Sequence, residues 1–422
     1  MKKIITIILV IVMTCTTLCI SALAEDNRPT GTLKMLMSSG GAAESLIKGI
    51  EAYMAETGNV IEYISYSTSE LREKQILNLR SVDNQQDIIM LDGGVWLAEQ
   101  NAYLEPLDEY IAQSGIDTDR FVDSFYNMFS LNGQQFALPF RIGGWVLLYR
   151  KDLFEAAGLT ETPKNMDELR EYAKILTKDG VYGFEAAMKQ GTFLVSQYAP
   201  FLYSYGGSFL NEDNTAAALN SEAGIKALQL LVDMLNTDGS IPDSALDNEH
   251  QGLYTALQQG LGAMAITYSP YYLNVNDPNA STVAGEFDVA PFLPTGSDSL
   301  DAGVSHFSGW GIAINKNSDK KDLAWDFIEF MTRPDVQTML AVDSVNAPVT
   351  KATFLDEKYL DVFPAAPQVL DAVNTGKSFP AISNWAKIED IIALELSNAL
   401  TLQKTPEQAL ADAETAINKE LR

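Results

Sequence analysis

The stretch DIIMLDGGVWLAEQNAYLEPLDEYI, residues 87–111, runs from a short apolar segment into a carboxylate, two glycines and a tryptophan. Its run of four apolar residues is typical of a strand that is buried on both faces, as in a parallel sheet. Ligands of open α/β sheets bind beyond the carboxyl ends of such strands. We therefore expect Asp92, the pair Gly93-Gly94 and Trp96 to lie in a loop at the edge of a ligand site.

Strand-like and helix-like segments alternate on both sides of this stretch, and such alternation predicts an α/β fold. The chain ends in a tail that is helical throughout. The expected strands span 33–37, 60–66, 88–91, 136–140, 145–149, 263–267, 287–291 and 310–314, and the expected helices span 42–56, 70–80, 151–157, 167–177, 192–204, 222–236 and 321–331.

Two helix starts carry capping signals. Thr405, Pro406 and Gln408 supply an N-cap, a proline at the first helical position and a capping-box partner. Asn165 and Glu168 show a similar pattern earlier in the chain. Helices are therefore predicted to begin directly after residues 165 and 405.

Residues 1–24 have the features of a secretory signal peptide: two lysines, an apolar run and the small-residue site Ala22-Leu23-Ala24. The apolar run is too short for a membrane span. Cys15 and Cys19 both lie in this segment, so the mature chain would hold no thiol, disulfide or cysteine metal site. The residues before these cysteines do not form a lipidation motif, and a lipid anchor is not expected. The sequence thus predicts an exported protein with a large conventional core.

The chain is strongly acidic. Without the signal peptide, 27 basic and 56 acidic side chains give a formal net charge of −29. This charge disfavours nucleic acids and anionic membranes as partners, and solubility is its simplest explanation. The sequence holds two histidines, His250 and His306, and no nucleophile-elbow, zinc-protease or phosphate-loop motif. We therefore expect no bound metal, no cofactor and no enzymatic activity.

An ordered set of motifs resembles the bacterial extracellular solute-binding proteins of family 1, which hand sugars to ABC importers. The opening stretch is one of them. The resemblance implies a type II periplasmic-binding-protein-like fold, in which two discontinuous α/β lobes are joined by a hinge and followed by a helical C-terminal tail. The other motifs are LLYRKDLFEAAGL (147–159), YGF (182–184), GGSF (206–209), GWGIAI (309–314) and AWDFI (324–328).

In this fold the chain crosses between the lobes several times, and proline, glycine and small polar residues suit the connectors. The expected crossings lie near 139–144, 305–309 and 346–350. We place the signal peptide at 1–24, lobe one at 25–140 plus 308–346, and lobe two at 141–307 plus 347–422.

The resemblance also implies a function. The protein would be the extracytoplasmic substrate-binding subunit of a carbohydrate ABC importer, a monomer in the periplasm or at the cell surface. Its partners would be a mono- or oligosaccharide and the membrane permease. Tyr268, Pro270 and Tyr271 stand where relatives have tryptophan, which leaves the sugar open. Two alternatives remain: a secreted glycoside hydrolase with two carboxylates, and a same-fold receptor for a non-sugar solute or a sensor kinase.

A sugar site needs hydrogen-bond acceptors for hydroxyl groups and aromatic surfaces for C–H faces. Asp92 is the expected charged acceptor, with Trp96 beside it. Glu44 would either add a second acceptor or simply be a carboxylate favoured at a helix N-terminus. Arg141 would either donate to a ligand oxygen or pair with a hinge carboxylate.

The aromatic candidates come from later in the chain. Trp310 is the first, because Gly309 lets the backbone approach closely. The resemblance adds Tyr268, Tyr271 and Trp385, which stand where relatives place aromatic ligand contacts.

Overall fold

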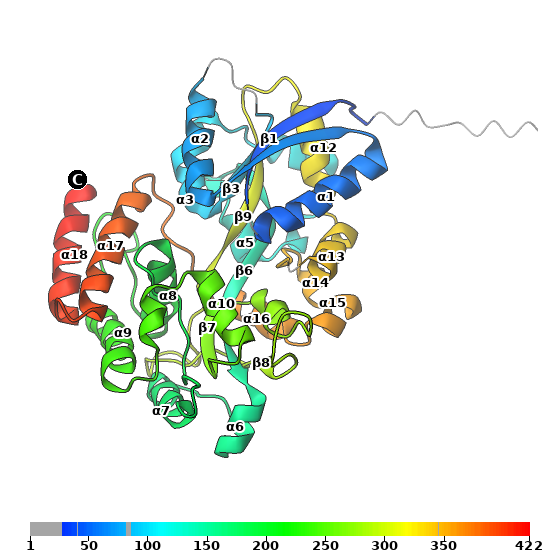
Figure 1. Ribbon diagram of the computed structural model, residues 1–422. Coiled ribbons are helices and arrows are strands. Elements are labelled where there is room, and N and C mark those ends of the chain that lie inside the picture. Colours follow the sequence, from blue (N-terminus) through cyan, green and yellow to red (C-terminus); the bar gives the residue numbers. More distant parts are fainter. Residues whose placement is uncertain (1–27, 40, 82–85, 345) are drawn as a thin grey trace, which may run out of the picture.

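The computed structural model describes residues 28–39, 41–81, 86–344 and 346–422. The expected signal peptide and both cysteines lie outside the described residues. Figure 1 shows two α/β lobes, one above the other, with strands β6 (Ala137–Arg150) and β9 (Phe307–Ile314) passing between them. The predicted two-lobed α/β fold is confirmed.

A seven-stranded sheet extends through both lobes in the order β2-β1-β3-β9-β6-β7, and β8 pairs with β6. The pairs β1–β2 and β1–β3 are parallel, whereas every pair formed by β6 or β9 is antiparallel. The remaining strands are β1 (Thr32–Ser38), β2 (Val60–Tyr66), β3 (Ile88–Asp92), β7 (Met264–Tyr268) and β8 (Phe287–Val289), with a separate hairpin of β4 (Ser130–Leu131) and β5 (Gln134–Gln135).

Strand β6 joins the lobes. Its residues 137–144 pair with β9, and its residues 145–150 pair with β7 and β8. The sequence suggested two short strands with a connector between them, and this was wrong, because one continuous 14-residue strand runs through the crossing. A Cβ atom added at Gly143 or Gly144 would lie 2.7 Å from the Tyr268 ring or 2.3 Å from Val373. These glycines therefore serve close packing along a buried strand.

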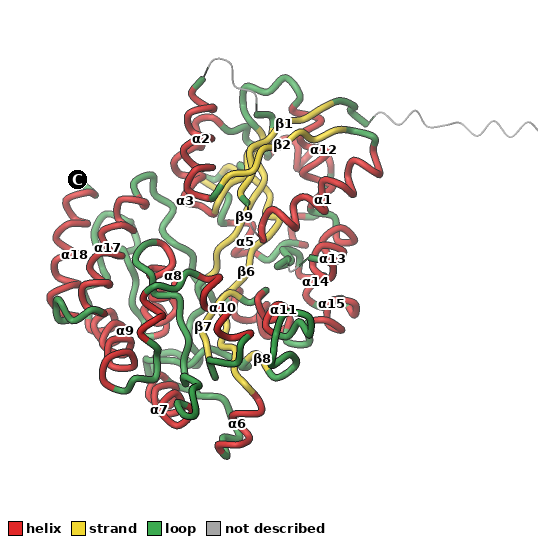
Figure 2. The backbone as a smooth tube through the Cα atoms, in the orientation of Figure 1, coloured by secondary structure: helices red, strands yellow, loops and turns green. Residues whose placement is uncertain are grey.

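The helices of the upper lobe surround the parallel strands (Figures 1 and 2). They continue into three short helices, α14 to α16, which contact α13, α5 and β6. The exact residues at which the chain passes from one lobe to the other stay a prediction. The upper-lobe helices are α1 (Gly41–Thr57), α2 (Thr68–Arg80), α3 (Gly93–Gln100), α4 (Asp108–Ser114), α5 (Asp123–Asn127), α12 (Lys321–Met331) and α13 (Pro334–Asp343). The three short helices are α14 (Lys351–Phe354), α15 (Glu357–Val362) and α16 (Ala366–Asn374), and their predicted place in lobe two stays a prediction.

The lower lobe is mostly helical, and the C-terminal pair α17 and α18 packs on α8 and α9. The helix predicted over 222–236 is confirmed: α9 is followed directly by a π-helical segment over residues 233–237. The helices of this lobe are α6 (Lys151–Ala157), α7 (Met166–Leu176), α8 (Thr192–Ser204), α9 (Glu222–Val232), α10 (His250–Gln258), α11 (Tyr271–Val275), α17 (Trp385–Leu400) and α18 (Pro406–Glu420).

Both capping predictions are confirmed. The Thr405 hydroxyl accepts a hydrogen bond from the Gln408 backbone N–H at 3.3 Å, and the Gln408 side chain accepts one in return. Asn165 Oδ1 accepts from the Glu168 N–H at 2.8 Å. These bonds satisfy donors that a helix start leaves unpaired.

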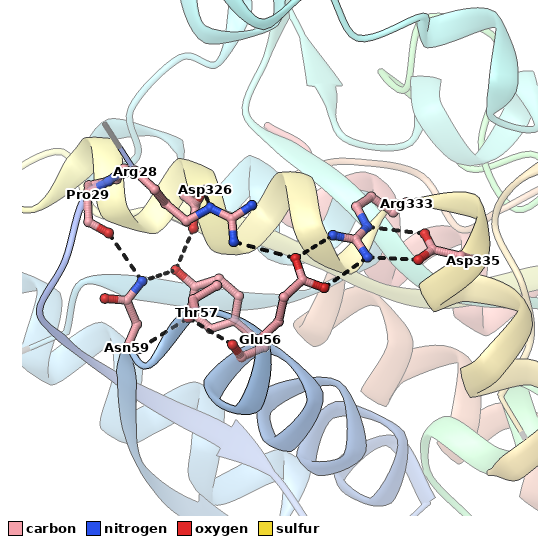
Figure 3. A network of polar contacts seen from close by, with 9 residues as sticks. Arg28, Pro29, Glu56, Thr57, Asn59, Asp326, Arg333 and Asp335 are labelled. Atoms are coloured by element: carbon pink, nitrogen blue, oxygen red, sulfur yellow. Dashed lines mark hydrogen bonds and ion pairs between the residues drawn. The ribbon is translucent and has the colours of Figure 1, made fainter. Parts of the chain in front are cut away.

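A polar network ties the C-terminal end of α1 to α12 and α13 (Figure 3). The Tyr53 hydroxyl donates to Asp326 at 2.7 Å and accepts from the Asn59 amide at 3.0 Å. Arg333, at the start of α13, donates twice to Glu56, at 2.7 and 3.1 Å. This guanidinium holds the pKa of the Glu56 carboxyl below its usual range. The bidentate pair thus links the end of α1 to the start of α13.

Glu185 is a buried carboxyl in the lower lobe. Its side chain is 2% exposed, and Oε2 has no hydrogen-bond partner among the described residues. Burial raises the pKa of Glu185 to about 8. The folded protein therefore keeps a proton on Glu185 that the unfolded chain releases above a pH of about 4.5. Ionisation stabilises the unfolded chain, so the free energy of unfolding falls as the pH rises from 4.5 to 8.

We expect Glu185→Gln to stabilise the fold by about 1 kcal/mol at pH 7 to 8 and to have little effect near pH 4.5. The amide cannot ionise in the unfolded state, but its buried NH₂ group offsets part of the gain. Thermal unfolding at several pH values measures the difference, with the exposed Glu212→Gln as a matched control. A stability difference that does not change with pH would contradict this account of Glu185.

Candidate functional site

A cavity of about 740 Å³ is lined by residues of both lobes. The first turns of α2 and α3 form its upper wall, and the first turns of α8 and α17 form its lower wall. Its lining residues are Ser39, Ser67, Thr68, Arg72, Asp92, Gly93, Gly94, Val95, Trp96, Met128, Thr192, Phe193, Ser196, Glu249, His306, Phe307, Ser308, Trp310, Ser378, Phe379, Trp385, Ala386 and Glu389.

Asp92 is the last residue of β3 and lies at the carboxyl end of the parallel strands. The expected loop after it was wrong, since α3 begins directly at Gly93. Asp92 makes no side-chain cap bond to this helix. Burial raises the pKa of Asp92 to about 7, although the nearby Arg72 opposes the rise. Because Asp92 makes no cap bond and lines the cavity, its carboxyl group is available to a ligand there.

Three of the candidate residues lie in one row across neighbouring strands. Asp92 of β3 is opposite Trp310 of β9, and Trp310 is opposite Arg141 of β6. Trp310 also meets Trp96 edge to face, with 5.6 Å between ring centroids. The strand register therefore places a carboxylate beside a pair of indole rings.

Trp385 approaches the same cavity from the lower lobe, at the first position of α17. Its ring packs against Phe379 at 5.1 Å and Phe209 at 5.6 Å. Trp385 is 1% exposed, so packing against these rings fixes the orientation of its indole. Four of the predicted residues, Asp92, Trp96, Trp310 and Trp385, thus share one cavity, and their role as ligand contacts stays a prediction.

Arg141 and Tyr268 lie together behind this wall. The guanidinium is 5.3 Å above the Tyr268 ring, and Nη1 donates to the Tyr268 hydroxyl at 3.5 Å. Within the described residues, Arg141 forms no ion pair with a carboxylate. Burial raises the pKa of Tyr268, and the charge of Arg141 lowers it. The cation thereby rests on an aromatic face.

The remaining candidates lie elsewhere. Tyr271 stacks on Tyr254, with 3.4 Å between ring centroids, and neither ring lines the cavity. Glu44 lies on α1 in a separate hollow of about 900 Å³, which also includes Tyr272 and Asn276. Gly309 is held by close packing, because a Cβ atom there would lie 2.2 Å from a backbone oxygen.

Sequence reasoning missed Glu389, which lines the cavity from α17 and accepts a hydrogen bond from the Thr192 hydroxyl at 3.0 Å. Burial raises the pKa of Glu389 to about 7, and the charge of Asp92 adds to the rise. One signal was available: Glu389 follows Trp385 by four residues, so a helix places both on one face.

The two histidines lie below the cavity in an aromatic cluster. His306 lines the cavity, and Trp145 contacts both His306 and His250, with ring centroids 6.0 and 5.4 Å apart. Burial lowers the pKa of each histidine to about 4. His306 Nδ1 lies 3.1 Å from the Lys377 carbonyl oxygen and must donate, because a carbonyl only accepts. Both rings are therefore neutral packing elements at pH 7.

Among the described residues, no cluster of three or more histidine, cysteine or acidic side chains could hold a metal ion. The same part of the chain contains no helix that is long and apolar enough to cross a membrane.

Comparison with known proteins places this geometry in context. The family model of the bacterial extracellular solute-binding proteins matches residues 38–338. A probable amino-acid ABC transporter periplasmic-binding protein of Sinorhizobium fredii is 23% identical over 398 residues, covering 92% of this chain and 89% of the relative. The mannitol-binding protein of Pseudomonas aeruginosa is 25% identical over 390 residues, covering 86% of each. The maltose-bound structure of MalE3 from T. maritima is 26% identical with a TM-score of 0.82, covering 92% of this chain and 98% of that one.

Proposed function

Because this chain belongs to the bacterial extracellular solute-binding proteins, we propose that it is the substrate-binding subunit of an ABC importer and that it binds a sugar or a polyol between its lobes. The mannitol-binding relative and the maltose-bound neighbour both support a polyhydroxylated ligand. The membrane partner would be the permease of that importer, and the protein would act as an exported monomer that binds its solute without chemical change.

The observation that carries this proposal is the composition of the interlobe cavity. Carboxyl groups of Asp92 and Glu389 face it together with the rings of Trp310, Trp385 and Phe379. Charged acceptors suit hydroxyl groups, and indole faces suit the C–H faces of a sugar or polyol. The cavity of about 740 Å³ is in the size range of small-molecule sites.

We expect the two crossing strands to form the hinge about which the lobes open and close. β6 and β9 connect the lobes by extended backbone rather than by a packed helix. Rotation about these strands would open the cavity, and a bound solute that contacts both walls would favour the closed form. The permease would then recognise the closed, loaded protein.

Titration of tryptophan fluorescence tests the proposal, because Trp96, Trp310 and Trp385 line the cavity. We expect saturable changes with maltose or D-mannitol and none with common amino acids. Amino acids are included because one relative is described as a probable amino-acid ABC transporter periplasmic-binding protein. No fluorescence change with sugars and polyols, or a saturable change with an amino acid instead, would overturn the proposed ligand class.

A second measurement separates a receptor from a glycoside hydrolase. The protein is incubated with maltose and malto-oligosaccharides, and the solutes are then analysed by chromatography. We expect them to be recovered intact. Accumulation of glucose would instead favour hydrolysis by two carboxyl groups of the cavity.

A further inference from the structure

Two carboxyl groups face the cavity from opposite lobes. Asp92 projects from the end of β3, and Glu389 projects from the second turn of α17. Among the described residues neither forms an ion pair, and the Thr192 hydroxyl is the hydrogen-bond donor to Glu389. Any solute that spans the cavity therefore meets acidic groups on both walls.

The other charges at the cavity are compensated. Arg72 pairs with Glu99 at 2.8 Å, and Glu249 pairs with Lys189 at 2.6 Å. His306 is neutral at pH 7, since burial lowers its pKa to about 4. With these pairs counted, the described lining carries two uncompensated negative charges when Asp92 and Glu389 are ionised. The described lining therefore offers an anionic solute no arginine or lysine without a carboxylate partner: Arg72 pairs with Glu99, and Arg141, which lies over the Tyr268 ring, is not part of the lining.

This charge distribution has a direct consequence for ligands. Burial raises the pKa of both carboxyl groups to about 7, and for Glu389 the charges of Asp92 and Asp390 contribute. A hydroxyl or ammonium group on the solute would stabilise the ionised carboxylates through charge-assisted hydrogen bonds. A carboxylate or phosphate on the solute would add a like charge in a partly desolvated space, which is strongly unfavourable.

We propose that Glu389 is a specificity-determining residue, and that Asp92 and Glu389 together select solutes presenting hydroxyl or ammonium groups and reject solutes carrying a carboxylate or phosphate. The inference rests on the proposed function and narrows its substrate class. Each carboxylate acts as an acceptor at one wall, so discrimination arises from both lobes in the closed form.

Two matched series of probes test this inference. D-Sorbitol, D-glucamine and D-gluconate share a six-carbon polyol chain and differ in the charge of one end. Maltitol, 1-amino-1-deoxymaltitol and maltobionate repeat the comparison on a disaccharide scaffold. At pH 8, we expect the wild-type protein to bind the acid at least about tenfold more weakly than the alcohol, and the amine at least as tightly as the alcohol.

The variant Glu389→Gln should reduce discrimination against the acid by about three- to tenfold and remove most of any preference for the amine. The amide keeps the size of the side chain and its bond from Thr192, so affinity for the alcohol should change less. Glu212→Gln is the matched control, because Glu212 is exposed and does not line the cavity. Calorimetry in two buffers adds a second readout: binding of the amine should release protons from the carboxyl pair.

The outcomes separate this inference from the proposed function. If sorbitol or maltitol binds but the acid binds equally well, or if Glu389→Gln leaves the discrimination unchanged, the charge selectivity is wrong and the proposed function is unaffected. If no sugar or polyol binds to the wild-type protein, the charge selectivity and the proposed function are both wrong. A preference for the acid over the alcohol would overturn the assigned charge selectivity outright.

Discussion

Asp92→Ala should weaken binding of the sugar or polyol ligand by about ten- to hundredfold and leave thermal stability nearly unchanged. A hydrogen bond to a charged acceptor contributes about 1.5 to 3 kcal/mol, which corresponds to this loss of affinity. Asp92 makes no cap bond to α3, so the substitution removes no hydrogen bond of the helix start. Removing a carboxyl group that burial disfavours also offsets the small loss of packing.

Fluorescence titration and thermal unfolding, measured on the same samples, check this expectation. Asp213→Ala is the matched control, because Asp213 is exposed and does not line the cavity. An unchanged affinity in Asp92→Ala would remove this residue from the site. A loss of affinity that occurs only together with a fall in thermal stability would assign Asp92 to folding instead.

The pH dependence of the same titration gives a further check. The pKa of Asp92 and that of Glu389 are both raised to about 7, so each carboxyl group gains a proton as the pH falls from 8 to 6. Affinity of the wild-type protein should fall over this interval, because the charge-assisted bonds are lost. Asp92→Ala should show a shallower dependence, and adding Glu389→Gln should remove the remainder.

Regular elements with local signals could be predicted from the sequence. Helix α18 begins where Thr405 and Pro406 place it, and strand β2 spans the predicted residues 60–66. The crossing between the lobes was different. Pro139 and the glycines of β6 indicate a connector in isolation, but the antiparallel partner β9, far away in sequence, pairs with this segment and extends it as a strand. Pairing over such a distance leaves no local pattern.

The candidate site was predicted only in part, because some of its residues have local sequence signals and others depend on tertiary packing. Asp92 and Trp96 adjoin a recognisable buried strand, and the structure places them in the interlobe cavity. Glu389 required knowledge of which face of α17 points toward the upper lobe. Tyr271 follows a strand as expected, but stacking on Tyr254 turns its ring away from the cavity lining. Side-chain direction at these positions is decided by tertiary packing, which periodicity does not encode.

Gly309→Ala should destabilise the protein by about 3 kcal/mol or more, the largest loss of stability expected here. A Cβ atom at this position would lie 2.2 Å from the Arg141 carbonyl oxygen and 2.5 Å from the Ile142 Cα. Both are backbone atoms of β6, so no side chain can rotate away. The backbone φ of +157° adds a smaller conformational cost.

Either β9 must separate from β6, which breaks ladder bonds, or the two strands must shift at the crossing that orients the lobes. The matched control is Gly133→Ala in the turn between β4 and β5, where φ is +79° and no atom lies within 4 Å of the added Cβ. It isolates the cost of positive φ, expected to be about 1 kcal/mol. Chemical unfolding and the yield of soluble protein measure both variants. Equal stability of the two would show that close packing at the crossing contributes little to the stability of the protein.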